Sequence, residues 1–191
     1  MPRTYTKSKR AENEAETRER IADAALSLHT ELGPAQTTIS QIAERAGVQR
    51  HTVYAHFPDE RAILMACSGL HMEREPLPVP EHWAEETDPA ERIRRALAEL
   101  YGWYERNAQL AAAFLRDAEH NTVLREVNML RMGPVFAAIH ASLSGGLGNR
   151  GNAALALALN FYTWRTLTRD AGMTSAAAVD LMVDTVLSAD D

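Results

Sequence analysis

Residues 49–52 are four consecutive side chains that can all form hydrogen bonds: Gln49, Arg50, His51 and Thr52. At the start of a short helix they could meet the edges of base pairs in the major groove of DNA, where donors and acceptors differ from pair to pair. Arg50 is the candidate for a bidentate contact with guanine, and Gln49 or Thr52 could contact adenine or a thymine methyl group. The residue types and their adjacency predict a contact that reads DNA sequence.

Four further side chains carry groups that suit phosphate oxygens. Tyr54 and His56 lie further along the same predicted helix, where a helix in the groove runs beside the DNA backbone. Thr38 and Ser40 stand at the amino end of an earlier short helix, where the helix dipole favours an anion. Such contacts position a protein on DNA without reading its sequence.

These side chains need two short helices joined at a fixed angle, and the sequence predicts that arrangement. Residues 38–41 have the form of a capping box and start a helix that ends near residue 46. Gly47 can adopt the left-handed conformation of a sharp turn, and residues 49–57 form the second helix. A longer amphipathic helix over residues 14–32 precedes the pair. The expected unit is a helix-turn-helix, whose second short helix enters the major groove. Its inner faces are apolar at Ile39, Ile42, Ala43, Val48, Val53 and Phe57.

Two runs in this region resemble the signature of the TetR family of transcriptional regulators. They read TTISQIAERAGV over residues 37–48 and TVYAHFPDERAIL over residues 52–64. The resemblance implies an all-α fold, with an N-terminal three-helix DNA-binding domain of the helix-turn-helix type and a C-terminal helical domain for ligand binding and dimerisation. It also implies that residues 49–52 face the groove, and that Tyr54 and His56 contact phosphates.

One position departs from the family pattern. Many members carry a lysine near the start of the fourth helix, where this chain has Asp59 and Glu60. A phosphate contact is not expected from these two residues. The candidates to replace it are Arg61 and a basic arm at residues 1–10, which holds four cations and no anion.

The rest of the chain also has helical periodicity. After a helix over residues 61–73, prolines make residues 76–90 a connecting segment. Further helices are expected over residues 90–105, 108–120, 122–143, 152–171 and 175–189. We expect two domains: residues 1–60, with the basic arm, bind DNA, and residues 61–191 bind the effector and dimerise.

The last two expected helices hold more apolar surface than one subunit normally buries. By the family resemblance they pack against their counterparts in a second subunit as a four-helix bundle. Residues 152–189 are therefore expected to form a homodimer interface. The side chains that suit close helix packing include Ala153, Ala156, Leu157, Phe161, Val179 and Leu181.

Bulky or polar side chains on the second-domain helices are candidates to line a cavity for a small-molecule effector, hydrophobic or amphipathic in kind. The alternative is that they form ordinary core, in which Met is a common filler. The candidate ligand-binding residues are Trp103, Tyr104, Phe114, Met132, Phe136, His140, Asn160 and Trp164.

Charge and composition exclude several other classes of protein. Of 191 residues with a net charge of −6, the first 61 balance nine basic against nine acidic groups, and the remaining 130 hold eleven against seventeen. This balance argues against a nonspecific nucleic-acid coat protein. No apolar run is long enough for a membrane span, and the N-terminus does not resemble a signal peptide, so we expect a cytoplasmic protein.

We expect no enzyme, cofactor or metal site. The single cysteine, Cys67, falls on an apolar stripe, where a thiol is inert, and the glycine-rich segment 145–148 lacks the lysine of a phosphate-binding loop. The histidines lack the spacings of metal ligands.

The expected function is that of a repressor that binds a palindromic operator on double-stranded DNA as a homodimer and is released by its effector. Two alternatives stay open. One is an activator or architectural DNA-binding protein without an effector, and the other is a helical small-molecule-binding protein or enzyme without sequence-specific DNA binding.

Overall fold

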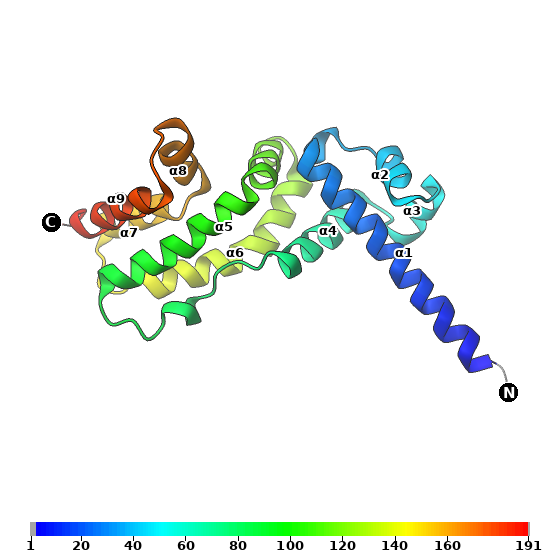
Figure 1. Ribbon diagram of the computed structural model, residues 1–191, viewed down its shortest axis with the longest axis horizontal. Helices are drawn as coiled ribbons and strands as arrows, with labels where there is room; N and C mark the ends of the chain where they lie inside the picture. Colours follow the sequence, from blue (N-terminus) through cyan, green and yellow to red (C-terminus); the bar gives the residue numbers. More distant parts are fainter. Residues whose placement is uncertain (1–2, 191) are drawn as a thin grey trace. The chain divides into compact units, whose positions relative to one another are not determined.

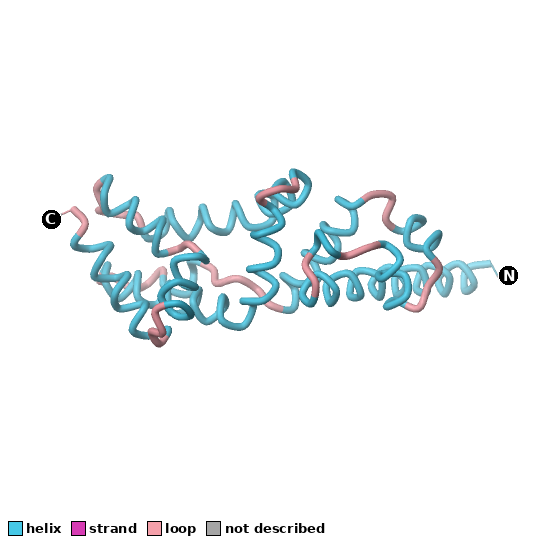
Figure 2. The backbone as a smooth tube through the Cα atoms, turned by 90° about the horizontal axis from the view of Figure 1, so that it is seen from above, coloured by secondary structure: helices cyan, strands magenta, loops and turns pink. Residues whose placement is uncertain are grey.

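The computed structural model describes the backbone of residues 3–190 and the side chains of residues 9–190. These residues form helices and connecting loops, with no strand among them (Figure 2). The all-α prediction is confirmed. No helix of the described part is long and apolar enough to cross a membrane.

The chain divides into two compact units. The first holds the residues up to Arg74 together with Ala112–Asn128, and the second holds Glu75–Ala111 and Met129–Asp191. The first unit therefore extends past the boundary expected after residue 60, because α4 (Glu60–Arg74) packs against α1 (Arg3–Glu31). The functional division at residue 60 remains a prediction.

The N-terminal helices of the first unit are α1, the short 3-10 helix η1 (Pro34–Gln36), α2 (Ile39–Ala46), α3 (Arg50–His56) and α4 (Figure 1). Their core is apolar and includes Ile21, Ile42, Val53, Phe57, Ile63 and Cys67. Helix α1 starts at Arg3 rather than near residue 14, and no Gly or Pro interrupts the chain between these two points. Of the basic arm, Lys9 and Arg10 lie exposed on α1, whereas residues 1 and 2, and the side chains up to residue 8, are outside the described part.

The second unit is built from η2 (Pro80–Trp83), most of α5 (Pro89–Ala118) and α6 (Thr122–Leu143), and then α7 (Asn149–Ala158), α8 (Phe161–Arg165), the π-helix η3 (Thr166–Asp170) and α9 (Ser175–Ser188). Helix α7 packs against α9. The connecting segment, residues 76–90, contains the short helix η2. Trp83 in η2 is buried, and its Nε1 donates to Oγ of Ser142 at 3.0 Å.

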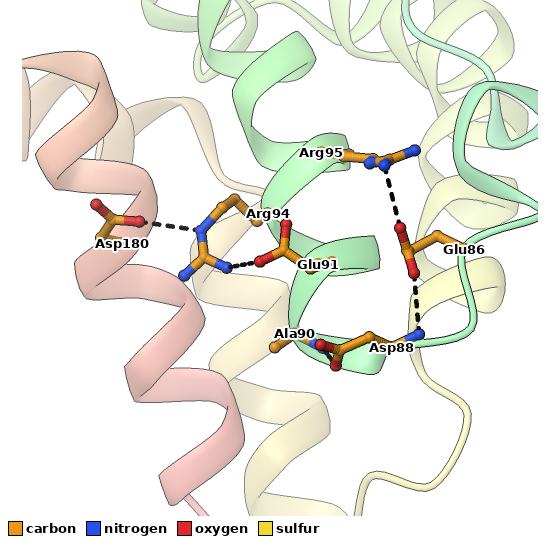
Figure 3. Close-up of polar contacts among 7 residues, drawn as sticks. All are labelled: Glu86, Asp88, Ala90, Glu91, Arg94, Arg95 and Asp180. Atoms are coloured by element: carbon orange, nitrogen blue, oxygen red, sulfur yellow. Dashed lines mark hydrogen bonds and ion pairs between the residues drawn. The ribbon is translucent and has the colours of Figure 1, made fainter.

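Ion pairs hold the start of α5 in the second unit (Figure 3). Arg94 bridges Asp180 on α9, at 3.1 Å, and Glu91 on its own helix, at 2.7 Å. One residue further, Arg95 pairs with Glu86 of the preceding loop at 3.1 Å. The pairs of Arg94 are exposed and should add little stability, whereas Glu86 in the pair with Arg95 is half-buried.

Two helix boundaries predicted from sequence are wrong, and each involves an asparagine. A break near Asn107 was expected, but α5 runs through it, because Nδ2 of this buried residue donates to the carbonyl of Trp103 one turn earlier at 2.9 Å. One helix over residues 152–171 was expected, but the chain breaks at Leu159 and Asn160. Oδ1 of Asn160 accepts from the amide of Tyr162 at 2.8 Å and so caps α8. The prediction of a helix over residues 122–143 is confirmed.

Candidate nucleic-acid interface

The two short helices form as the sequence predicts. Oγ1 of Thr38 accepts from the amide of Gln41 at 3.3 Å, and Oε1 of Gln41 accepts from the amide of Thr38 at 2.8 Å, which completes the capping box of α2. Gly47 has φ 66° and ψ 37°, a left-handed conformation that suits glycine. The amide of Val48 returns to the carbonyl of Ala43 at 2.9 Å, which closes the turn into α3.

Helix α3 buries one side and exposes the other. Val53 and the following Phe57 have no exposed surface. Gln49, Arg50 and His51 are exposed, and Thr52 is half-buried. Gln49 is the N-cap residue of α3, yet its side chain makes no capping hydrogen bond. In the described part of the chain, none of these four side chains has a hydrogen-bond or ion-pair partner, so all four are available to a partner molecule.

The predicted phosphate-binding side chains differ in their surroundings. Tyr54 keeps 48% of its surface exposed, and Ser40 is exposed in the first turn of α2. His56 is half-buried, and its ring lies beside that of Phe57, with centroids 6.5 Å apart. Thr38 is exposed, but its hydroxyl serves the capping box. All four contacts with phosphate remain predictions.

Helix α2 is fixed to α1 by an exposed polar cluster. Arg45 donates to both carboxylate oxygens of Glu31, at 2.7 and 2.9 Å, and to Oγ of Ser27 at 2.8 Å. Hydrogen bonds from Arg45 and then Ser27 lower the pKa of Glu31 to about 2. Arg45 is thus engaged within the protein.

The structure brings three of the predicted ligand-binding residues together in the second unit. The ring of Tyr104 lies 5.8 Å from that of Trp103 and 5.7 Å from that of Trp164, measured between centroids. All three are buried. Within the described residues, Nε1 of Trp164 is a buried side-chain donor that has no hydrogen-bond partner.

The other predicted ligand-binding residues lie apart from this cluster. Phe114 packs beside Leu64 in the first unit. Asn160 is exposed and caps α8. The remaining three are half-buried at intervals of four residues along α6: Met132, Phe136 and His140.

Sequence reasoning did not predict the structural contacts of Tyr101, Tyr104 and Arg18. The hydroxyl of Tyr101 donates to the carbonyl of Ala158 at 3.0 Å, and the hydroxyl of Tyr104 donates to the carbonyl of Leu159 at 2.6 Å. Both side chains therefore satisfy carbonyl groups at the carboxyl end of α7. The spacing of Tyr101 and Tyr104 by three residues places both on one helix face, which is a signal the sequence does carry. Arg18 contacts the end of α3 at His56, which lies 38 residues later in the sequence. No local sequence pattern indicates this contact.

Comparison with known proteins finds sequence relatives among bacterial transcriptional regulators. Residues 21–67 match the model for bacterial regulatory proteins of the tetR family. The HTH-type transcriptional regulator TtgR of Pseudomonas putida is 34% identical over 95 residues. Residues 21–67 are thus similar in sequence to bacterial regulatory proteins of the tetR family. The match with TtgR covers 49% of this chain and 45% of TtgR, so the chain matches less than half the length of that relative.

Two solved structures of regulators share the fold over most of the chain. FadR from Bacillus halodurans, a fatty acid degradation regulator, superposes with a TM-score of 0.66 at 20% identity, covering 90% of this chain and 95% of FadR. FadR from Bacillus subtilis, determined in complex with stearoyl-CoA, gives 0.60 at 20% identity, covering 89% and 97%. The fold of both units is therefore shared with these regulators.

The acidic pair that departs from the tetR-family pattern has internal partners. Asp59 accepts from the amide of Ala62 at 2.7 Å at the start of α4, and Glu60 accepts from Nδ2 of Asn121 at 3.1 Å. Arg61, one candidate to replace the missing lysine, pairs with Glu126 at 3.0 Å. All three exposed side chains therefore make polar contacts within the first unit.

Proposed function

We propose that this protein is a DNA-binding transcriptional repressor that binds a palindromic operator as a homodimer and leaves it when a small-molecule effector binds. The observation that carries the proposal is the outer face of α3. Gln49, Arg50, His51 and Thr52 are without partners in the described chain, while Val53 and Phe57 fix the inner face in the core. A polar, unpartnered helix face on a rigid support suits the reading of base edges.

The exposed faces of α7 and α9 support the homodimer. Leu157 on α7 keeps 60% of its surface exposed and Leu181 on α9 keeps 43%, with the small Ala153 and Ala177 exposed beside them on the same helices. Small residues allow a close approach of helices, and the leucines supply apolar area for burial. We infer that residues 152–189 pair with the same residues of a second copy. Two recognition helices must then lie about 34–36 Å apart to enter successive major grooves.

The aromatic cluster around Tyr104 supports an effector site in the second unit. A buried donor without a partner, such as Nε1 of Trp164, costs about 1–3 kcal/mol, and an acceptor on a bound molecule would recover that free energy. Aromatic rings around one unpartnered polar group suit a hydrophobic or amphipathic effector. The regulator from Bacillus subtilis was determined with stearoyl-CoA, so this fold can hold a ligand. We propose no cofactor, metal or catalytic role, and we place the protein in the cytoplasm.

The proposed mechanism is a shift between two dimer geometries. An effector releases DNA only if it binds more tightly to the geometry in which the recognition helices are wrongly spaced. Its differential affinity for the two states sets how far the population moves.

The experiment that tests the proposal is selection of bound sequences from random duplex DNA. We expect a palindromic sequence, because a two-fold symmetric dimer reads two half-sites. On that operator, Arg50→Ala should weaken binding by about 1–3 kcal/mol and relax the preference at one position of each half-site. Tyr54→Phe should weaken binding to all sequences about equally, since a phosphate contact carries no base preference.

The matched control is Arg95→Ala, which removes one exposed positive charge from the second unit and should leave binding unchanged. Failure to enrich any sequence would refute sequence-specific binding. If Arg50→Ala and Tyr54→Phe both bind like the wild type, α3 does not face DNA in the proposed way.

A further inference from the structure

The carboxyl end of α3 is held by a side chain from α1. Arg18 donates from a guanidinium nitrogen to the carbonyl of His56, the last residue of α3. Its Cζ lies 4.1 Å from the ring centroid of Phe57. One guanidinium therefore makes a hydrogen bond and a stacking contact at the same helix end.

Both contacts are favourable on physical grounds. The last carbonyls of a helix have no partner within the helix, and they carry the negative end of its dipole, so a cation placed there satisfies and stabilises them. A guanidinium over an aromatic face adds a cation–π attraction. Phe57 is fully buried, so Arg18 also covers one face of the ring that anchors α3 to the core.

The length of α3 makes this support important. Seven residues, Arg50–His56, give about two turns, and an isolated helix of that length is not stable in water. The amino end of α3 is fixed through the turn at Gly47 and the amide of Val48. The carboxyl end needs a separate anchor, and Arg18 provides one from 38 positions earlier in the chain.

We propose that Arg18 is a positioning residue for DNA binding: it sets the direction of α3 and therefore the placement of Arg50 and its neighbours against base edges. This inference rests on the proposed function. Arginine is required because its planar group can stack on Phe57 and donate to His56 together, whereas the ammonium group of lysine is a compact point charge that cannot make both contacts.

Two variants separate this role from a direct phosphate contact. Arg18→Lys keeps the charge and loses the paired geometry, and Arg18→Gln loses both. The matched control is Arg20→Gln, which removes the same charge from an exposed position two residues further along α1. The first measurement is amide hydrogen exchange at Phe57, whose amide donates to the carbonyl of Val53 at 2.8 Å. The second is affinity for the selected operator as a function of salt concentration.

We expect the amide of Phe57 to exchange faster, on the order of tenfold, in both Arg18 variants, and not in Arg20→Gln. Operator affinity should fall in both Arg18 variants, with lysine giving no rescue. The slope of log affinity against log salt concentration should stay as in the wild type, because no phosphate contact is lost.

Rescue of affinity by Arg18→Lys, together with a slope reduced by about one in Arg18→Gln, would overturn the proposal in favour of a phosphate contact. Unchanged exchange at Phe57 would overturn it as well, because α3 would then not depend on Arg18. Failure of the wild type to bind any duplex would instead refute the proposed function, and the exchange measurement alone would then show whether Arg18 holds α3.

Discussion

Lowering the pH from 7 to 5 should destabilise the first unit by about 2 kcal/mol through one side chain, His29. This residue of α1 is only 5% exposed, and its Nδ1 lies 3.6 Å from Sγ of Cys67. Burial lowers the pKa of His29 from 6.5 to about 4, and the negative charge of Asp117 opposes the shift only in part. In the native state the imidazole is therefore neutral over the pH range in which an unfolded chain protonates it.

The sign and size of the effect follow from these two pKa values. Above about pH 6.5 His29 is neutral in both the native and the unfolded state, so the native state keeps its full stability. As the pH falls below 6.5, His29 is protonated in the unfolded state but stays neutral in the native state, and the free energy of unfolding decreases. A difference of about 2.5 pKa units corresponds to a total loss of about 3 kcal/mol once the pH reaches 4. About two thirds of that loss should be complete at pH 5.

The assay is urea unfolding at pH 7, 6 and 5, followed by far-UV circular dichroism. The variant is His29→Asn, which does not titrate, and the matched control is His120→Asn, at an exposed histidine. His29→Asn is expected to be less stable than the wild type at pH 7, because a smaller side chain leaves a cavity, but it should lose less stability on acidification. Equal losses in the wild type and His29→Asn between pH 7 and 5 would refute the reasoning, whatever their absolute stabilities.

Two further predictions concern the second unit, whose unfolding can be followed by tryptophan fluorescence because Trp83, Trp103 and Trp164 all lie in it. Tyr104→Phe removes the 2.6 Å hydrogen bond to the carbonyl of Leu159 and should lower the free energy of unfolding in urea by about 1–3 kcal/mol. An unchanged midpoint of urea unfolding would contradict this. Gly151→Ala should be neutral or destabilising, since the new Cβ would lie 2.3 Å from the carboxylate of Asp190, which accepts from the amide of Gly151 at 3.0 Å. In a protein that already carries Asp190→Ala, Gly151→Ala should raise the free energy of unfolding by up to about 1 kcal/mol, because alanine has the higher helix propensity. If Gly151→Ala changes Tm equally with and without Asp190, the contact between its Cβ and the Asp190 carboxylate has no effect on stability.

The features that sequence predicted correctly are those fixed by neighbours in the chain. The capping box at Thr38 and Gln41 needs only a four-residue pattern, and the turn at Gly47 needs only a residue that tolerates positive φ. The burial of Val53 and Phe57 follows from helical spacing. Local chemistry was therefore enough to define α2, the turn and α3.

The features that sequence could not predict depend on distant partners. An asparagine can bond back to its own helix, as Asn107 does, or cap a new one, as Asn160 does. At residues 159 and 160 the break is supported by the hydroxyls of Tyr101 and Tyr104 on α5, which serve the last carbonyls of α7. No pattern within α7 and α8 contains that information.

The same reasoning applies to the proposed recognition surface, where the side chains proposed to read bases lie on α3 and part of their support comes from α1. The side chains available to base edges all lie at the start of α3, but α3 is too short to be stable alone. Its neighbour α2 is tied to α1 by Arg45 and Glu31, and its own carboxyl end is tied to α1 by Arg18. Substitution of Arg18 in α1 should therefore weaken binding to the operator through the position of α3, whereas substitutions at the start of α3 should change which sequence the protein prefers.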